Sequence, residues 1–341
     1  MKQALCLLLL ALTSFAHAQQ IKPELKELLD ATITRTQEIS YYTSEVDWDK
    51  LTAAVHAKVE GAQELDDLVP AFETLLNTLR DHHGRILKLP AHSILANFTD
   101  HEKARYSDTR PRDPDTWAIV NDTESRFESE LLPGSVGYLK VVGVGPNVDG
   151  QKEAERIRRA VVELAEEEQV EGWILDLRYN GGGNINVMLA GLAPLIDTKT
   201  VASVRTHDQQ VQGTAQIKKG NFYYMDRNAF PIEQSTKLKR PKIAVLLSRW
   251  TVSSGELAAI AFKGQRNVRF FGEASGSYTT NTSYDRIGEQ IAIVIATGVF
   301  CDRNGKAYDE HVLPDVEVAF DAGSDFEEDE GIQRAVEWLK E

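Results

Sequence analysis

The sequence predicts an α/β fold in which a core of alternating strands and helices follows an N-terminal helical region. Helical periodicity dominates from residue 21 to about residue 83, and short apolar runs alternate with amphipathic segments after residue 134. Such alternation is typical of a sheet with crossover connections. A chain of 341 residues, 42% of them hydrophobic and 26% charged, is also long and apolar enough to bury a sizeable core.

The first 18 residues read as a signal peptide. Lys2 precedes an apolar run from Ala4 to Leu12, and the Ala-His-Ala ending suits cleavage after Ala18. The apolar run is too short for a permanent transmembrane helix, and no later segment reaches the ~18 apolar residues that one needs. We therefore expect an exported protein, periplasmic or extracellular, without stable membrane insertion.

Charge and composition narrow the partners and cofactors. Without Lys2, 37 basic and 52 acidic side chains leave a net charge of about −15, which argues against a nucleic-acid partner. A cationic ligand fits this charge, although acidity more often serves solubility. Cys301 alone remains after residue 18, and the histidines lack H-E-x-x-H spacing, so a disulfide framework and a zinc peptidase are disfavoured. No metal or organic cofactor is implied.

Residues 19–88 form the expected N-terminal helical domain. The segment PELKELLDATITRTQEI carries apolar residues at helical spacing, with Pro23 suited to a first turn. Segments beginning near Trp48 and Leu65 repeat this amphipathic pattern. Residues 89–134 contain several prolines and the run RPRDPD, so we expect a connecting region there.

Residues 135–341 form the expected core domain. Its strands and helices alternate in the order that an α/β sheet requires. We expect strands at 135–144, 173–179, 242–248, 268–275 and 291–302, and helices at 151–168, 185–196 and 256–262.

The stretch SRWTVSSGELAA places two serines between a strand and a helix. Ser253 and Glu256 have the S-x-x-E spacing of a capping box, which satisfies amides of the first helical turn. A serine at such a turn can instead be a nucleophile, because the helix N-terminus offers free amides for an oxyanion. The G-x-S-x-G elbow of α/β-hydrolases is absent. By itself, the stretch favours the cap.

Two further stretches have both an ordinary and a chemical interpretation. Asn180–Gly183, NGGG, follows a strand and matches neither a phosphate loop nor a dinucleotide loop. It is a flexible turn or a source of backbone amides for a reaction intermediate. His82 and His83 follow a helix, and they are either surface residues or the base for a serine nucleophile.

The order of these stretches resembles the C-terminal-processing, or tail-specific, serine peptidases, a family that includes tricorn-type proteases and the nisin-resistance protease. The resemblance covers about residues 136–318. The matching blocks are WILDLRYNGGG, VLLSRWTVSSGELAA, RFFGEASGSYTTN and LPDVEV, with LRDHH in the family's D-x-H position upstream.

The resemblance implies roles for individual residues. Ser253 would be the nucleophile and His83 its base, although the sequence does not exclude His82. Ser254 would lend its amide to the oxyanion hole. The second oxyanion donor would come from the glycines of NGGG, namely Gly181, Gly182 and Gly183.

One departure from the family decides the mechanism that we expect. Tail-specific members use a serine–lysine dyad, but Tyr278 stands where we align that lysine, and no lysine occurs between Lys263 and Lys306. The serine–histidine version of the nisin-resistance and tricorn-type branches fits better. The tricorn-type branch adds a carboxylate, for which Asp309 and Glu310 are the candidates.

A second departure concerns the domains. Many members carry a PDZ domain, and the 89–134 region is too short for one. The resemblance implies a crotonase/Clp-protease-like ββα core behind an N-terminal helical bundle, with the active site between the two. We expect an exported serine endopeptidase acting on peptides or protein tails through a Ser-His acyl-enzyme, a cationic peptide being one hypothesis. The alternatives are a non-catalytic ligand- or peptide-binding protein on this fold and a crotonase-like acyl-transforming enzyme.

Overall fold

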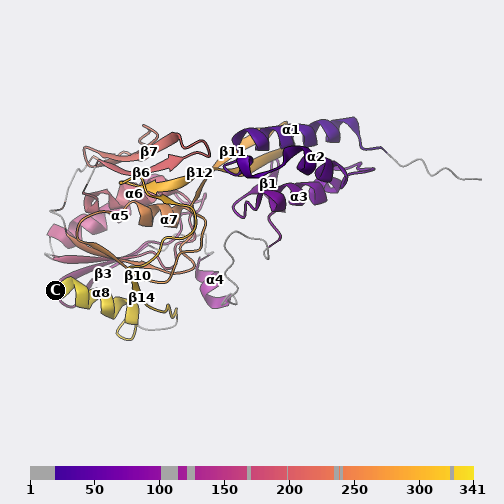
Figure 1. Ribbon diagram of the computed structural model, residues 1–341. Helices are drawn as coiled ribbons and strands as arrows, with labels where there is room; N and C mark the ends of the chain where they lie inside the picture. The colour runs from indigo at the N-terminus through magenta and orange to yellow at the C-terminus, as the bar shows by residue number, and fades with distance from the viewer. Residues whose placement is uncertain are drawn as a thin grey trace, which may run out of the picture.

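A computed structural model describes residues 20–100, 114–120, 127–166, 170–197, 199–233, 238, 241–322 and 326–341. The expected signal peptide and most of the proline-rich stretch RPRDPD lie outside these ranges. Figure 1 shows two lobes, one built around the N-terminal helices and one around the core sheets. The helices are α1 (Pro23–Ile39), α2 (Trp48–His56), α3 (Val69–Leu79), α4 (Pro114–Val120), α5 (Gly150–Glu166), α6 (Ile185–Leu192), α7 (Ser254–Ile260) and α8 (Glu330–Lys340).

The core is built on a six-stranded sheet in the order β14-β10-β9-β5-β4-β3. Its pairs are parallel except for the antiparallel pair β3–β4. Parallel neighbours need crossover connections, which the helices of the core supply. The strands are β3 (Glu128–Leu132), β4 (Val136–Lys140), β5 (Gly172–Asp176), β9 (Lys242–Leu247), β10 (Val268–Gly272) and β14 (Val316–Glu317).

Both faces of this sheet are covered, which explains why its central strands read as continuous apolar runs. On β5, Trp173 and Leu175 face the main core with α5, α6 and α7, whereas Ile174 faces the smaller core under α8. The expected α/β fold with a ββα core is thus confirmed.

A second sheet joins the two lobes through one long strand. Its main path is β2-β1-β12-β6-β7-β8, and β11 and β13 also pair with β12. All twelve residues of β12 are buried, with Ile291 and Ile293 in the N-terminal core and Phe300 in the main core. The strands are β1 (Arg85–Lys88), β2 (Ser93–Asn97), β6 (Thr200–Arg205), β7 (Val211–Lys218), β8 (Asn221–Tyr224), β11 (Thr280–Ile287), β12 (Ile291–Asp302) and β13 (Ala307–Tyr308).

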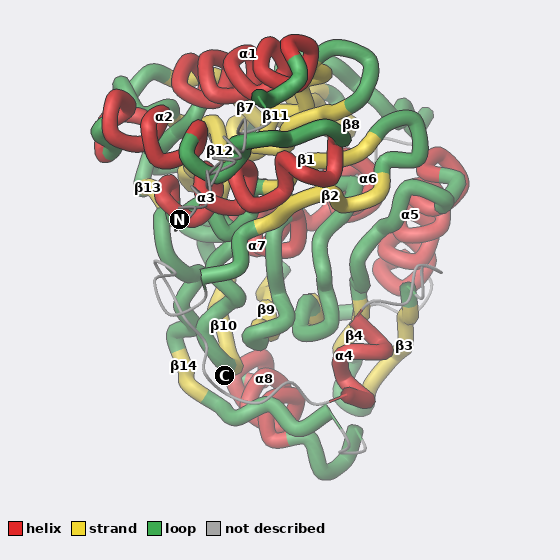
Figure 2. Tube along the Cα trace, turned by 90° about the vertical axis from the view of Figure 1, so that its right-hand side faces the viewer, coloured by secondary structure: helices red, strands yellow, loops and turns green. Residues whose placement is uncertain are grey.

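The N-terminal helices differ in one respect from the expected bundle. They pack against a sheet as well as against one another, because Leu29 and Phe72 share one core with Ile86 of β1 and with the β12 isoleucines. Figure 2 shows α1, α2 and α3 grouped with β1 and β2 at one end of the molecule. Strands β1 and β2 have four and five residues, too few to show a clear period in the sequence. Across the described ranges, no helix has the length and apolar character needed to cross a bilayer.

Candidate active site

Ser253 lies at the sharp turn between β9 and α7 with φ +54° and ψ −120°. A positive φ is strained for a residue with a side chain, so the surrounding contacts must impose it. The hydroxyl of Thr251 donates to the carbonyl of Leu177 at 2.8 Å, and the amide of Val252 donates to the carbonyl of Asn180 at 3.0 Å. These two bonds fix the loop that presents Ser253.

The serine hydroxyl faces a histidine. Ser253 Oγ lies 3.3 Å from His83 Nε2. The carboxylate half of the capping box is formed, because Glu256 Oε2 accepts from the Ser253 amide at 2.9 Å. The hydroxyl of Ser254 donates to the carbonyl of Gly183 at 2.7 Å, so it ties α7 to the glycine loop. The stretch therefore begins a helix and also directs the Ser253 hydroxyl at an imidazole.

His83 is held by the end of α3 and by β12. Arg80 ends α3 in the left-handed conformation with φ +55°, which turns the chain toward the core. The buried carboxylate of Asp81 accepts from the His83 amide at 3.2 Å and from the Ala296 amide at 2.9 Å. Asp81, the aspartate of the D-x-H element, thus anchors the histidine turn to the strand that joins the two lobes.

The environment of His83 favours a neutral imidazole. Burial lowers the pKa of His83 to about 3, and the charges of Arg85 and His82 act in the same direction, while the backbone of Thr280 opposes them. Nδ1 lies 2.9 Å from Thr280 Oγ1. An Nδ1–H that donates to Thr280 leaves the lone pair of Nε2 facing the Ser253 hydroxyl, which is the tautomer that a general base needs.

His82 points elsewhere. Its Nε2 lies 2.5 Å from the carbonyl oxygen of Ser277, away from the nucleophile turn. The ring of Tyr278 packs edge-on against His82 at 4.7 Å and against His83 at 5.3 Å between ring centroids. Tyr278, which we aligned with the family's lysine, therefore forms a wall beside both imidazoles.

The two candidate orienting carboxylates do not meet the histidine in this arrangement. The hydroxyl of Thr280 occupies Nδ1 of His83, and neither Asp309 nor Glu310 is among the groups that shift the His83 pKa. The carbonyl of Glu310 accepts from the hydroxyl of Thr279 at 3.5 Å. Sequence reasoning overlooked Thr280, although it stands two residues after Tyr278 in the motif GEASGSYTT.

Glu256 is a buried hub whose role in the site the sequence did not reveal. Its Oε2 accepts from the amides of Ser253 and Tyr278, and its Oε1 accepts from the Ser275 hydroxyl and the Ser277 amide. Burial raises the pKa of Glu256 to about 8, against the opposing effect of these hydrogen bonds. One carboxyl thus joins the nucleophile turn to the segment that packs on the histidines.

The glycine loop lies directly against the nucleophile. A Cβ built on Gly182, whose φ is +95°, would meet the Ser253 Cβ at 2.9 Å. A Cβ on Gly183, whose φ is +103°, would meet the carbonyl of Val144 at 2.1 Å. Only glycine fits these two positions, because both the conformation and the space exclude a side chain.

The amides around Ser253 divide into engaged and available donors. The Gly182 amide donates to Asn180 Oδ1 at 3.0 Å and is engaged. In the part of the chain that the structure describes, no hydrogen bond engages the amides of Gly181, Gly183 or Ser254. Free amides beside a nucleophile can stabilise a developing oxyanion.

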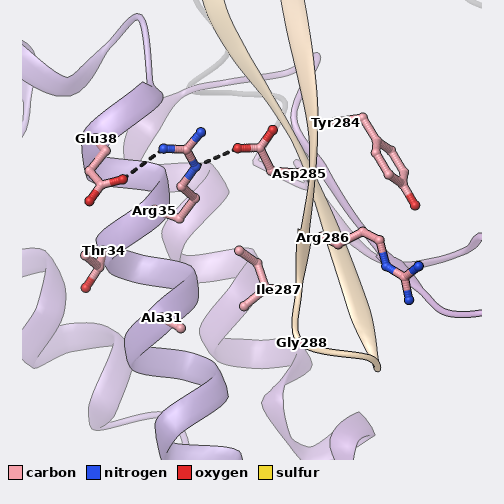
Figure 3. Close-up of a pocket in the computed structure, with 9 residues that line it drawn as sticks. All are labelled: Ala31, Thr34, Arg35, Glu38, Tyr284, Asp285, Arg286, Ile287 and Gly288. Carbon is pink, nitrogen blue, oxygen red and sulfur yellow. Dashed lines mark hydrogen bonds and ion pairs between the residues drawn. The ribbon is translucent and has the colours of Figure 1, made fainter.

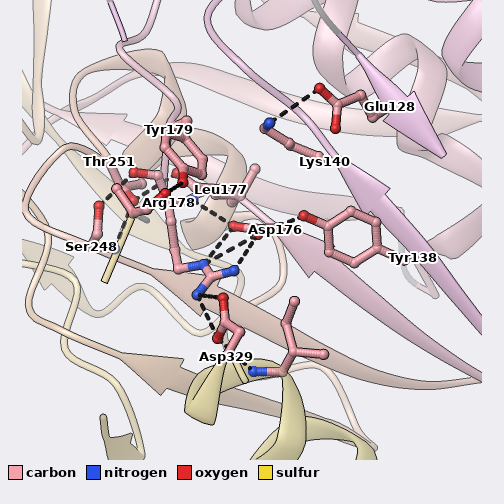
Figure 4. A network of polar contacts seen from close by, with 12 residues as sticks. Glu128, Tyr138, Lys140, Asp176, Leu177, Arg178, Tyr179, Ser248, Thr251 and Asp329 are labelled. Carbon is pink, nitrogen blue, oxygen red and sulfur yellow. Dashed lines mark hydrogen bonds and ion pairs between the residues drawn. The ribbon is translucent and has the colours of Figure 1, made fainter. Parts of the chain in front are cut away.

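A buried network of ion pairs and hydrogen bonds surrounds Asp176 and Arg178, which directly precede the glycine loop in the chain (Figure 4). Arg178 pairs with Asp176 and with Asp329, which caps the N-terminus of α8, each at 2.7 Å. The hydroxyl of Tyr138 donates to Asp176 at 2.8 Å. Ser248 donates its hydroxyl to the Arg178 carbonyl, so the network is also linked to the loop after β9. Among the described side chains, no group of His, Cys, Asp or Glu is arranged to hold a metal ion.

Comparison with known proteins shows to which family the chain is similar. The sequence pattern of peptidase family S41 matches residues 135–318. A nisin-resistance protein from Lactococcus lactis subsp. lactis is 30% identical over 173 residues, which cover 50% of this chain and 50% of that protein. The chain thus aligns with half the length of this curated relative.

Solved structures share the fold. A lipoprotein from Streptococcus agalactiae superimposes with a TM-score of 0.69 at 19% identity, over 95% of this chain and 99% of that one. The photosystem II D1 C-terminal processing protease gives a TM-score of 0.58 at 16% identity, over 92% and 97% of the two chains. At these identities the likeness extends to the fold alone.

Proposed function

Since the chain belongs to peptidase family S41 and is a serine-type peptidase, we propose that it is an exported endopeptidase that cleaves peptides or protein tails through a Ser253–His83 acyl-enzyme. The main support is the 3.3 Å approach of Ser253 Oγ to His83 Nε2. Nucleophile and base often lie slightly beyond ideal hydrogen-bond distance before substrate binds. Burial lowers the pKa of His83 to about 3, so the imidazole is unprotonated at neutral pH, as a base must be, but it is a weaker base than a histidine with an ordinary pKa.

The proposed reaction has two halves. His83 Nε2 takes the proton of Ser253 as the serine oxygen attacks the scissile carbonyl, and the oxyanion is bound by the amides of Ser254 and Gly183. His83 then gives the proton to the leaving amine, and an ester links Ser253 to the acyl part. In the second half, His83 takes a proton from a water molecule as the water oxygen attacks that ester. His83 then gives this proton to the Ser253 oxygen as the acyl part leaves.

Thr280 is the orienting residue in this proposal. Asp309 and Glu310, the carboxylates that we considered from the sequence, are replaced in this role by a hydroxyl at 2.9 Å from Nδ1. A neutral hydroxyl selects the tautomer by accepting from Nδ1–H, but it stabilises an imidazolium less than a carboxylate would. We therefore expect a slower enzyme than one with a full triad.

Export and cellular location rest on the sequence. Residues 1–18 have the signal-peptide pattern, and a nisin-resistance protein is 30% identical over 173 residues. We propose a location in the periplasm or outside the cell, a core domain of residues 135–341, and a peptide substrate, with cationic peptides to be tried first. Sequencing the N-terminus of the protein recovered after expression from the full gene tests export, and a first residue of Gln19 supports it.

A diverse peptide mixture, read by mass spectrometry, tests the activity. The protein starting at Gln19 is compared with Ser253→Ala and His83→Ala, and the exposed positions Ser129→Ala and His207→Ala serve as matched controls. We expect the two controls to cleave like the wild type and the two site variants to lose at least about 10²-fold in rate. Equal cleavage by Ser253→Ala would show that this serine only begins a helix. Absence of cleavage by any protein would favour the non-catalytic binding protein.

A further inference from the structure

Strand β11 connects the candidate active site with a distant pocket. It begins at Thr280, whose hydroxyl contacts His83, and ends at Ile287. A strand advances about 3.4 Å per residue, so Asp285 lies about 17 Å and Ile287 about 24 Å along the strand from Thr280. An extended chain that runs alongside β11, away from Ser253 and His83, therefore reaches the pocket after five to seven residues.

Among the strands that the structure describes, none pairs with the outer edge of β11. In the sheets formed by the described residues, β11 pairs with β12 alone. The middle of the strand is half-buried or exposed, and the side chain of Tyr284 is 47% exposed. Such an edge presents alternating N–H and C=O groups that can pair with another extended chain.

The pocket lies between α1 and the far end of β11 (Figure 3). Its volume is about 660 Å³, enough for one or two side chains of a bound peptide. Arg35 of α1 joins the two walls by donating to Asp285 of β11 at 2.6 Å, and within α1 it also donates to Glu38 at 2.9 Å. The lining residues are Ala31, Thr34, Arg35, Glu38, Tyr284, Asp285, Arg286, Ile287 and Gly288.

The lining charges favour recognition of the main chain over a particular side chain. The lining holds two guanidinium groups, of Arg35 and Arg286, and the two carboxylates of Glu38 and Asp285, and both carboxylates accept from Arg35 (Figure 3). The formal charges of these four groups cancel, so the pocket does not select strongly for a ligand of one sign. An extended polypeptide fits such a site, since its amides and carbonyls pair with the strand edge and its side chains are accommodated by the pocket.

We propose that the outer edge of β11 and the pocket at its end form an extended subsite that binds the polypeptide substrate as an added β-strand. A substrate residue five to seven positions from the one beside Thr280 occupies the pocket. This inference rests on the proposed function, because it treats the occupant as the chain that Ser253 cleaves. The subsite predicts a preference for long, unfolded substrates with little side-chain selectivity at the pocket.

Peptide length and pocket filling test the proposal together. One cleaved sequence from the peptide mixture is prepared as a six-residue peptide and with ten residues added at either end. We expect one extension to raise kcat/KM at least about tenfold, since several main-chain hydrogen bonds are added. Ala31→Trp, at an exposed position that lines the pocket, should abolish this gain and leave the short peptide unaffected. Ala54→Trp, at an exposed position of α2, is the matched control.

Main-chain pairing is tested by binding to the inactive variant Ser253→Ala. A fluorescent 16-residue peptide is compared with two versions N-methylated at alternate residues of the added segment. We expect one methylated version to bind at least about tenfold more weakly and the other to bind like the parent, because only alternate amides face the strand. Equal binding of all three, or equal gains from length in Ala31→Trp and wild type, would overturn the subsite. Absence of cleavage of the short peptide by the wild type would instead contradict the proposed catalytic function.

Discussion

Replacing Thr280 by valine should slow the enzyme without unfolding it. Valine keeps the shape of threonine and removes the hydroxyl that lies 2.9 Å from His83 Nδ1. Thr280 is 4% exposed and His83 is 9% exposed, so water cannot easily replace the lost acceptor. An unsatisfied buried N–H costs about 1–3 kcal/mol. If that cost falls on the productive tautomer, it corresponds to a loss of about 5- to 150-fold in kcat.

The assay is steady-state cleavage of a peptide found in the mixture experiment, with thermal unfolding measured in parallel. Thr280→Ser keeps the hydroxyl and should retain kcat within a few-fold, which separates orientation from packing. We expect KM to change little in both variants, because Thr280 acts through His83. A Thr280→Val enzyme with wild-type kcat and an unchanged pH profile would refute the orienting role.

Four further predictions concern the pH dependence of cleavage and the variants Glu256→Gln, Gly182→Ala and Arg178→Met. Because the pKa of His83 is about 3, kcat/KM should change less than twofold from pH 8 to pH 5. With a histidine of pKa 6.5 as the base, kcat/KM would fall about 30-fold over this range. Stopped assays at several pH values measure the difference. Glu256 has a pKa of about 8 when folded and an ordinary value of 4.5, so its contribution to stability is full below pH 4.5 and falls by up to about 1.4 kcal/mol per unit as pH rises to 8. The Tm of the wild type should therefore fall relative to that of Glu256→Gln from pH 5 to pH 8. Gly182→Ala should reduce kcat at least about 10²-fold, since its Cβ would displace Ser253, and a Tm within a few degrees of wild type would confirm a local effect. Arg178→Met should cost about 3–5 kcal/mol in urea unfolding, because it leaves buried carboxylates unpaired.

The core could be predicted from the sequence because its signals are local and strong. The strand β5 is buried on both faces, so it reads as the apolar run Trp173–Leu175. The amphipathic helix α5 shows its period plainly, and NGGG marks a turn that tolerates no side chain. Ser253, Ser254 and the glycines were singled out through the order of their motifs, although each motif taken singly favoured a structural explanation.

Other features depend on contacts between distant segments, which no local pattern encodes. His83 and Thr280 are 197 positions apart, and they meet where the turn after α3 and strand β11 both lie against β12. Glu256 resembled a simple capping residue, and the three donors from residues 275–278 emerge only when the chain folds back. The segment 200–224, where β6, β7 and β8 form an antiparallel sheet, alternates too weakly to have been assigned.

Covalent labelling tests the central claim most directly, since it needs no knowledge of the substrate. The protein is incubated with a fluorophosphonate, which reacts with activated serines, and the modified residue is located by peptide mass mapping. We expect a single adduct on Ser253, no adduct in Ser253→Ala, and labelling at least about 10²-fold slower in His83→Ala than in His207→Ala. Absence of labelling at Ser253, or equal labelling rates in the two histidine variants, would contradict it.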